Sequence, residues 1–488
     1  MSEQQKETPF LQAFCPILVL AVLIIYGLIL RPLWLGQPPI PLEIIFVLSA
    51  ALTVGQLFLL GYQWKAIQAS IVAKLARALP AFFILFCIGL IIASWIVSGT
   101  IPMLVAWGLE IIDPNYLYLV AFLAPVIFST LTGTSWGSVG TIGVVILGIA
   151  TALQANLGIT AGAIIGGAYF GDKMSPLSDT TNLAALAADV DLFQHIQSMM
   201  ITTFPSAILA GVIYFFMGWV DPPLASQADL ETVQPYLVGL RSIFYFNWLL
   251  LLPPAIVLFG SLRKMPTVPV LGASIIAACL LALMIQPFTI TDVVASMYQG
   301  FDTSKMVTWV EQVPPQVSVL LDRGGLYALN EPIITAFMVF VFIGTMDHIR
   351  AMPTVVNRLL SMVHTARTTI LTTLVCTGIT NALTSNQYAT SFIVGDAFKN
   401  KYDRLGIPRK VLSRSLEDAG TMIESVIPWT ATSLFMVATL GISFSDYWHW
   451  QLLSLINLVV AVFLATTGIG CFLGKTGDPA DRRAGAED

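Results

Sequence analysis

Gly166-Gly-Ala-Tyr-Phe-Gly-Asp-Lys-Met-Ser-Pro-Leu-Ser-Asp-Thr-Thr-Asn182 is a polar run between apolar flanks, and it decides the fold of this chain. It holds two carboxylates, one ammonium, four Ser/Thr hydroxyls, an amide and a proline. Each charge at bilayer depth costs about 2.5–3.5 kcal/mol, so a functional site is the default interpretation. Pro176 and the glycines free backbone carbonyls, which is tolerated where they line a cavity or face protein. The run therefore predicts a broken membrane helix; a loop outside the membrane is the alternative.

The composition places most of the chain in a lipid bilayer. Its 488 residues are 56% hydrophobic and 10% charged, whereas soluble proteins carry about a quarter charged residues. The net charge is −5 without a long basic run, so we expect no nucleic acid partner. The five cysteines lack a metal-binding spacing and are expected to be free. Enzyme motifs are absent, since Gly474-Lys-Thr476 lacks the first glycine of a phosphate loop; we expect neither an enzyme nor an ATP-driven pump.

The apolar segments predict an all-α polytopic membrane protein. A span needs about 20 mostly apolar residues. Eight segments fit this directly: 10–30, 41–62, 80–97, 197–220, 246–262, 269–286, 328–347 and 448–472. The regions 116–153, 159–190 and 368–440 are too long or too interrupted. We expect about ten spans, two re-entrant hairpins at about 116–153 and 368–398, and two broken spans at 159–190 and 411–440.

The positive charges orient this threading. If the N-terminus is cytoplasmic, most of the 23 Lys and Arg fall in cytoplasmic segments, and so does the C-terminus. Two full spans in place of each hairpin would leave the sides unchanged. Charge therefore supports the orientation of the chain and does not decide whether the hairpins are re-entrant.

The chain also shows a weak internal repeat. Gly133-Thr-Ser-Trp136 aligns with Leu383-Thr-Ser-Asn386, and the same spacing aligns Ser175-Pro-Leu-Ser178 with Ser425-Val-Ile-Pro428. The order span, span, span, hairpin, broken span, span occurs twice. Five crossings in each half predict an inverted-topology repeat, with the site where the halves meet. We predict that the first repeat covers 1–245, the second 246–475 and a cytoplasmic tail 476–488. Coincidence between two hydrophobic patterns is the alternative.

The two hairpin tips carry hydroxyl and amide side chains. In the first tip we expect Thr134 and Ser135 to be ion ligands, although Gly133 and Gly137 also suit plain helix packing. The second tip is more polar, and its candidate ligands are Thr384, Ser385 and Asn386.

The second broken span adds the acids Glu417, Asp418 and Glu424. Burial penalises the charged form of a carboxyl group, whereas a nearby cation favours it. One carboxylate can therefore hold either a proton or Na⁺, which would couple the two fluxes. We take Asp418 and Glu424 as candidate sites. A simple position at the start of a helix, next to the basic loop 399–414, is the alternative for Glu417 and Asp418.

The remaining charged groups permit two further expectations. Lys173 is expected to pair internally with a carboxylate other than Asp172, because adjacent helical residues point apart. The four histidines lie near predicted span ends, where a solvated interfacial position is expected. His348, beside Asp347, is the best candidate for a sensor of cytoplasmic pH.

Four segments closely resemble signatures of the NhaC-type Na⁺/H⁺ antiporters. They are Ser98-Gly-Thr-Ile-Pro102, Gly133-Thr-Ser-Trp-Gly-Ser-Val-Gly-Thr141, Gly171-Asp-Lys-Met-Ser-Pro-Leu-Ser-Asp-Thr-Thr-Asn182 and Ser413-Arg-Ser-Leu-Glu-Asp-Ala-Gly-Thr421. The resemblance spans roughly 80–440. It departs at 423–430, where the family reads close to Thr-Ser-Pro-Leu-Ile-Pro-Trp-Asn and this chain reads Ile-Glu-Ser-Val-Ile-Pro-Trp-Thr.

The resemblance implies exchange of Na⁺ for H⁺ across the bacterial inner membrane, an inverted repeat with re-entrant hairpins, and often a homodimer. Na⁺ is then the transported ion, and no cofactor is expected. The residues that fall on the family signatures are Asp172, Ser175, Asp179, Thr180 and Asn182 at the helix break, with Thr134 and Ser135 on the hairpin. The expected Na⁺ ligands are Asp179, Asn182, Thr134 and Ser135.

Two functions remain open at this stage. The first hypothesis is a Na⁺/H⁺ antiporter in which Asp172 and Asp179 alternate between proton and Na⁺, with Glu424 or Asp418 contributing. The second is an ion-coupled exchanger of small organic solutes, such as carboxylates (malate or lactate) or amino acids, motivated by the altered segment 423–430. A channel or receptor is disfavoured, since paired hairpins and broken helices suit alternating access.

Overall fold

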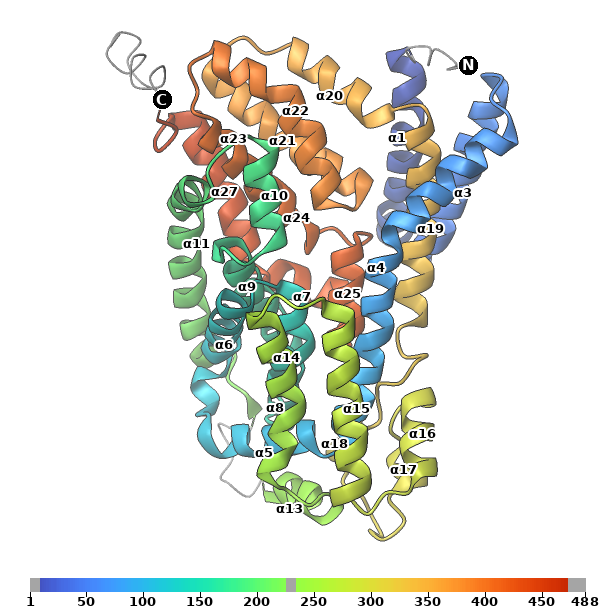
Figure 1. The fold of residues 1–488 in the computed structure, drawn as a ribbon, viewed down its shortest axis with the longest axis vertical. Coiled ribbons are helices and arrows are strands. Elements are labelled where there is room, and N and C mark those ends of the chain that lie inside the picture. The colour runs from blue at the N-terminus through green and yellow to red at the C-terminus, as the bar shows by residue number, and fades with distance from the viewer. Residues whose placement is uncertain (1–8, 225–233, 473–488) are drawn as a thin grey trace.

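The computed structural model describes residues 9–224 and 234–472, and these residues form helices and connecting turns without a β-strand (Figure 1). The predicted tail 476–488 and the segment Gly474-Lys-Thr476 lie outside the described residues. The all-α polytopic class is confirmed. Within the described residues, eight helices are long and apolar enough to cross a membrane, or up to ten if each sharply bent helix pair counts as one span.

The helices of the first half follow the predicted order. They are α1 (Phe10–Ile24), continued by η1 (Ile25–Leu30) and α2 (Arg31–Trp34), α3 (Leu42–Leu59), α4 (Trp64–Val97), α5 (Thr100–Ile111), η2 (Pro114–Tyr116), α6 (Leu117–Thr132), α7 (Ser135–Ser138), η3 (Val139–Gly143), α8 (Val144–Ala152), α9 (Leu157–Met174), α10 (Asp179–Ala187) and α11 (Leu192–Val220).

The second half repeats this order with more short helices. Its elements are α13 (Gln234–Ile243), η5 (Trp248–Leu251), α14 (Leu252–Leu262), α15 (Thr267–Ile285), α16 (Ile290–Gln299), α17 (Thr303–Met306), α18 (Pro315–Leu321), α19 (Asn330–His348), α20 (Ala351–Ser361), α21 (Ala366–Thr384), α22 (Gln387–Arg404), α23 (Arg409–Leu416), η6 (Glu417–Thr421), α24 (Met422–Glu424), α25 (Ala431–Leu440), α26 (Phe444–Tyr447), η7 (Trp448–Trp450) and α27 (Leu452–Thr467).

The two hairpins enter the molecule from opposite ends. The hairpin of α6, α7 and α8 occupies the lower half of Figure 1, whereas that of α21 and α22 occupies the upper half. Helix α5 lies across the lower end and α20 across the upper end. This is the arrangement of an inverted repeat. The boundary between the two repeats, at residues 245 and 246, stays a prediction. It falls in the connection between α13 and η5.

Local chemistry explains the hairpin turns and the helix breaks. Each hairpin turns at a residue in the left-handed backbone region, Gly133 (φ 71°) and Ser385 (φ 49°). Glycine adopts this conformation freely, whereas serine is strained there and must be held by its surroundings. Helix α9 ends two residues before Pro176, whose missing N–H and fixed φ cannot continue a helix. The chain stays non-helical over 175–178 and again over 425–430.

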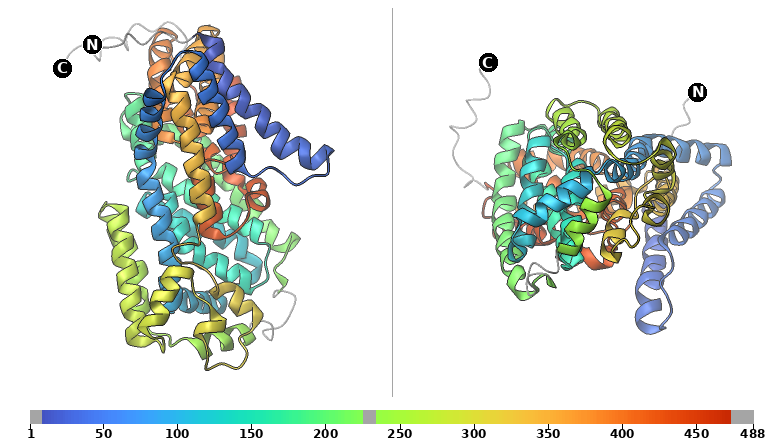
Figure 2. Two further views of the ribbon diagram at one scale, coloured as in Figure 1. Left: turned by 90° about the vertical axis from the view of Figure 1, so that its right-hand side faces the viewer. Right: turned by 90° about the horizontal axis from the view of Figure 1, so that it is seen from below.

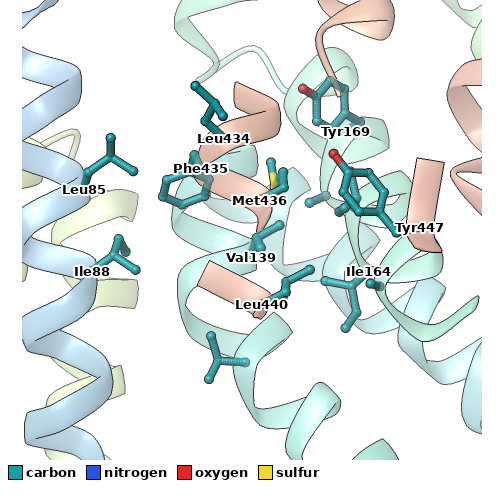
Figure 3. Close-up of a cluster of buried hydrophobic side chains, with 14 of the residues drawn as sticks. Leu85, Ile88, Val139, Ile164, Tyr169, Leu434, Phe435, Met436, Leu440 and Tyr447 are labelled. Atoms are coloured by element: carbon teal, nitrogen blue, oxygen red, sulfur yellow. The ribbon is translucent and has the colours of Figure 1, made fainter. Parts of the chain in front are cut away.

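An apolar core joins the hairpins to the long helix α4. Leu85 and Ile88 on α4 face Phe435 on α25, close to Val139 of η3 and Ile164 of α9 (Figure 3). The first helix of the chain, in contrast, slants away from the bundle (Figure 2). Leu11 of this helix, with Leu33 and Trp34 of its continuation α2, is at least three-quarters exposed, as suits contact with lipid.

Candidate functional site

Both hairpin tips and both helix breaks open onto one cavity of about 600 Å³. The first half lines it with the tip of its hairpin and with the break between α9 and α10. The second half contributes the other tip, η6, α24 and the start of α25. Two basic residues, Arg77 on α4 and Lys264 between α14 and α15, line it as well. The predicted meeting of the halves therefore produces a polar chamber.

Asp172 lies in this cavity at the end of α9 and is held by the facing hairpin tip. Its Oδ2 accepts hydrogen bonds from the Ser135 N–H (3.2 Å) and the Ser135 hydroxyl (2.6 Å). Its Oδ1 accepts one from the Ser178 hydroxyl (2.5 Å), which lies across the helix break. The side chain is almost fully buried. Hydrogen bonds to a carboxylate favour its ionised form, against the cost of burial.

Asp179, Thr180 and Asn182 follow the break and also line the cavity. Asp179 is exposed to it and is the first residue of α10, where a negative charge interacts favourably with the helix dipole. The Thr180 hydroxyl lies 3.1 Å from the Ser178 hydroxyl. The side-chain amide of Asn182 donates hydrogen bonds to the carbonyl oxygens of Pro176 (3.0 Å) and Ser178 (2.6 Å). Asn182 thereby closes the break and keeps only its amide oxygen free for a ligand.

Ser175 differs from these residues. It is buried and does not line the cavity, and its hydroxyl oxygen accepts a hydrogen bond from the Leu177 N–H (3.2 Å). Ser175 therefore stabilises the turn between α9 and α10.

The first hairpin tip is fixed by its own cap and by a contact with the second half. Thr134 lines the cavity, and its Oγ1 accepts a hydrogen bond from the Gly137 N–H (3.2 Å). Trp136 stacks on Phe435 of α25, with ring centroids 4.3 Å apart and an angle of 13° between the planes. The tip therefore touches Asp172 in its own half and α25 in the other.

The second tip is equivalent in structure but shifted by two residues from the sequence alignment. Ser385 takes the place of Gly133 at the turn, and Asn386 caps α22 by accepting from the Ala389 N–H (2.8 Å), as Thr134 caps α7. The Ser385 Oγ also accepts from the Ala431 N–H (2.7 Å), which ties this tip to the second break. Ser385 and Asn386 line the cavity, whereas Thr384 faces Thr390 (3.0 Å between hydroxyl oxygens) and does not.

Glu424 is the acid that the second half places at the cavity. It is nearly buried at the end of α24, immediately before the second break. Oε1 accepts from Asn381 Nδ2 (3.2 Å) and Oε2 accepts from the Thr432 hydroxyl (2.8 Å). Each half thus presents one buried carboxylate, Asp172 or Glu424, beside its helix break.

Asp418, in contrast, does not line the cavity. It is buried behind it, in an ion pair with the fully buried Lys173, and its Oδ1 also accepts from Thr202 (2.9 Å) and Asn457 (3.0 Å). Arg414 Nε lies 3.8 Å from its other oxygen. The expectation that Lys173 pairs with a carboxylate other than Asp172 is confirmed. The pair joins the first broken helix to the second.

A family model described as the Na⁺/H⁺ antiporter family matches residues 167–469 of this chain, which include both helix breaks and the second hairpin. The chain belongs to the Na⁺/H⁺ antiporter family. It is therefore a multi-pass membrane transporter, as its helices and their composition require.

Antiporter relatives match over most of the chain. A protein of Haemophilus influenzae described as an uncharacterized Na⁺/H⁺ antiporter is 40% identical, over 94% of this chain and 96% of that protein. The Na⁺/H⁺ antiporter NhaC of Bacillus subtilis is 33% identical, over 88% of this chain and 92% of its own. A malate-2H⁺/Na⁺-lactate antiporter of the same organism is 30% identical, over 84% and 86%. The resemblance to the NhaC-type antiporters is confirmed.

Sequence reasoning missed several groups that the antiporter fold brings to the site. Thr432, which binds Glu424, and Gln387, beside Gly420, were not singled out, because their positions depend on how hairpin and broken helix pack. Thr202 and Asn457 come from α11 and α27 and would read as ordinary polar residues of a span. The sequence feature that could have identified them is that an amide or hydroxyl group inside a membrane span needs a hydrogen-bond partner.

His364 and His449 are exposed, as expected of solvated positions, whereas His195 departs from that expectation and His348 is half-buried. His195 is fully buried on α11, with Nδ1 2.8 Å from the Ser413 hydroxyl, because α23 packs over the start of α11. His348 lies edge-on to Tyr62, with ring centroids 4.7 Å apart. Asp347, beside it, forms an ion pair with Lys74 (2.9 Å). The role of His348 as a pH sensor stays a prediction.

Proposed function

We propose that this protein exchanges Na⁺ for H⁺ across the bacterial inner membrane by alternating access, and that Asp172 and Asp179 alternate between proton and Na⁺. The observation that carries the proposal is Asp172, which is buried at the point where a hairpin tip meets a helix break and borders a polar cavity. One carboxylate that binds either cation, and not both at once, is sufficient to couple their opposite movements.

The two acids would divide the work between them. Asp179, exposed in the cavity, attracts a hydrated cation. Asp172 replaces part of its water shell with carboxylate and hydroxyl oxygens, the ligands that hard cations prefer. Thr134, Ser135, Thr180 and Asn182 line the same cavity and are candidate further ligands. Glu424 approaches from the second half and is a candidate second proton carrier.

The orientation rests on charge. The ends of α20, α22 and α23 at the upper end of Figure 1 carry Arg358, Lys401, Arg404, Arg409 and Lys410, and we place this end in the cytoplasm, together with both termini. The same threading, with a cytoplasmic N-terminus, places Arg77 and Lys264 on the cytoplasmic side, and both residues line the cavity. Their presence supports a chamber that opens toward the cytoplasm.

The test is exchange by the purified protein in liposomes that hold a pH gradient. Addition of Na⁺ or Li⁺ should change the signal of an internal pH dye with the wild-type protein. Asp172→Asn should reduce the change to the level of empty liposomes, because an amide cannot hold a transported proton. Glu311→Gln, at an exposed position, is the control and should behave as wild type. An unchanged dye signal with wild-type protein would overturn the proposal.

Exchange of small organic solutes is the second candidate function. The cavity volume of about 600 Å³ lies within the range of small-molecule sites and far exceeds a bare cation. Its lining combines the bases Arg77 and Lys264 with the acids Asp172, Asp179 and Glu424, a mixture that suits a carboxylate or an amino acid. Uptake of radiolabelled malate, lactate and amino acids, with and without a Na⁺ gradient, tests this; no uptake of any of them would remove it.

We further propose a homodimer without a resident cofactor, since Na⁺ and H⁺ are themselves the transported species. The slanting first helix exposes a long apolar surface that either lipid or a second copy can cover. Light scattering of the protein in detergent measures the mass of the assembly; a monomer mass would overturn the dimer.

A further inference from the structure

Five buried oxygen atoms without a hydrogen-bond partner lie on two elements that pack together, α21 and η6. They are Thr380 Oγ1, Asn381 Oδ1, Glu417 Oε1, Glu417 Oε2 and Thr421 Oγ1. The four side chains are at most 2% exposed. Buried polar groups in folded proteins are almost always paired, so this concentration of unpaired oxygens requires an explanation.

The amide N–H groups nearest to these oxygens are engaged elsewhere, and the Thr421 hydroxyl faces the Glu417 carboxyl group. Asn381 Nδ2 donates to the Gly420 carbonyl (2.8 Å), to Gln387 Oε1 (3.1 Å) and to Glu424 Oε1 (3.2 Å). Gln387 Nε2 is likewise engaged, with the Leu416 carbonyl (3.0 Å) and Ser391 (3.1 Å). Both amide nitrogens therefore have partners, and the amide oxygen of Asn381 has none.

The backbone around Glu417 is also unusual. Residues 417–421 form a π-helical turn inside the second broken helix. Such turns are rare and are found frequently at functional sites. The turn places Glu417 and Thr421 one helical turn apart, and Thr421 also lines the cavity. Of the four side chains, that of Thr421 lines the chamber described above, and the other three lie behind it.

An isolated buried carboxylate is too costly to persist, so Glu417 must bind either a proton or a cation. The surrounding charges do not neutralise it. Lys173 is committed to Asp418, and Arg414 lies 3.8 Å from Asp418. Two further acids, Asp172 from the first half and Glu424 from α24, are near enough to act on Glu417 electrostatically and add negative charge. All five unpaired atoms are oxygens, as a hard cation prefers.

The ligand set also selects among cations. The described residues contain no group of three or more His, Cys, Asp or Glu that would hold a transition metal. One carboxylate with an amide oxygen and two hydroxyls carries a single formal negative charge, which suits a monovalent cation better than a divalent one. Without bulk water around it, the site would bind the ion through protein oxygens.

We infer that Glu417, Thr421, Thr380 and Asn381 form a second Na⁺ site, between the second hairpin and the second broken helix and separate from Asp172. The inference rests on the proposed exchange of Na⁺, and it assigns to the second half a cation site of its own. Thr421, which borders the cavity, connects this site to the chamber.

The experiment is a count of bound Na⁺ by equilibrium dialysis of the purified full-length protein against ²²Na⁺ at alkaline pH. The wild-type protein should bind two ions per chain. Glu417→Gln and Asp172→Asn should each bind one, because each removes a different site, and the double variant should bind none. Glu311→Gln is the matched control for the loss of one acid and should still bind two.

The outcomes separate this inference from the proposed function. If the wild-type protein binds one ion and Glu417→Gln leaves that number unchanged, Glu417 holds only a proton and the second site is overturned, while Na⁺ exchange stands. If the wild-type protein binds no Na⁺, the proposed exchange is overturned as well. Should Glu417→Gln fail to fold, Thr421→Val and Thr380→Val keep the size of each side chain and should each weaken binding of the second ion alone.

Discussion

The two helix breaks share a geometry and differ in where they place their charges. At the first break Asp172 faces the cavity and Lys173 points away from it into the protein. At the second, Glu424 faces the cavity, and the acids Glu417 and Asp418 are buried one to two turns earlier. The ion pair between Lys173 and Asp418 connects the two arrangements. An inverted repeat can therefore keep its backbone symmetry and still give each half separate chemistry.

Asp172→Asn should have the largest effect, and it tests the role assigned to the first helix break. Exchange in liposomes should fall to background, because the asparagine keeps hydrogen-bonding capacity toward Ser135 and Ser178 but cannot carry a proton. Circular dichroism of the same preparation should be unchanged. Residual exchange close to the wild-type rate would move the ion site to Asp179.

Lys173→Met should have the next largest effect, on stability. It leaves Asp418 as an uncompensated buried charge, and losing one partner of a buried pair costs about 3–5 kcal/mol. The melting temperature in detergent should fall sharply for Lys173→Met and for Asp418→Asn. The double variant should lose less than the sum of the two, since no charge is then left alone. Additive losses would show that the two residues act independently.

Glu424→Gln should have an intermediate effect and would sharpen the contrast between the halves. Glutamine can keep contacts with Asn381 and Thr432, so the fold should persist. Loss of the negative charge at the cavity should raise the Na⁺ concentration for half-maximal exchange about tenfold, equivalent to about 1.4 kcal/mol. Titration of exchange with Na⁺ measures this, with Glu311→Gln as the control. An unaltered Na⁺ dependence would place Glu424 outside the transport site.

Asp189→Asn should have the smallest effect. Asp189 lies in the turn after α10 and binds Lys399 (3.0 Å) and Arg409 (3.0 Å), so it ties the first broken helix to the second hairpin. The hydrogen bond from Lys399 lowers the pKa of its carboxyl below the ordinary value. Its stabilisation is therefore present at neutral pH and is lost as the pH falls through that lowered pKa.

Because the Asp189 side chain is about half exposed, the pair should contribute less than about 1 kcal/mol. The melting temperature of Asp189→Asn should be slightly below that of the wild-type protein at neutral pH, and the difference should vanish in acid. A difference that persists in acid would point to a role other than charge.

Much of this architecture could be predicted from the sequence, because membranes restrict the choices. Apolar length identified the spans, and the polar run around Pro176 identified the first break, since charges and freed carbonyls at bilayer depth need a protein-lined cavity. The contact between Ser135 and Asp172 agrees with the predicted facing of tip and break. The repeat was visible as an order of elements, which survives when residue identity does not.

The rest depended on packing that a single sequence does not encode locally. The two-residue shift between the hairpin tips arises where the helices turn, at Gly133 in one and Ser385 in the other. It places Asn386, rather than Thr384, beside the cavity. The withdrawal of Asp418 from the cavity required Thr202 and Asn457, which arrive from distant spans. The burial of His195 required α23 to cover α11.

The apolar contact between α4 and the core has a mechanical consequence. Leu85 and Ile88 lie opposite Phe435 in one apolar cluster, where dispersion forces have no preferred direction (Figure 3). Trp136 and Phe435, like Ser385 and Ala431, link parts on one side of that contact. Sliding at the face of Leu85 and Ile88 would cost no hydrogen bond there, whereas separating hairpin from broken helix would cost several. The fold thus provides one surface suited to slippage and one assembly suited to moving as a unit.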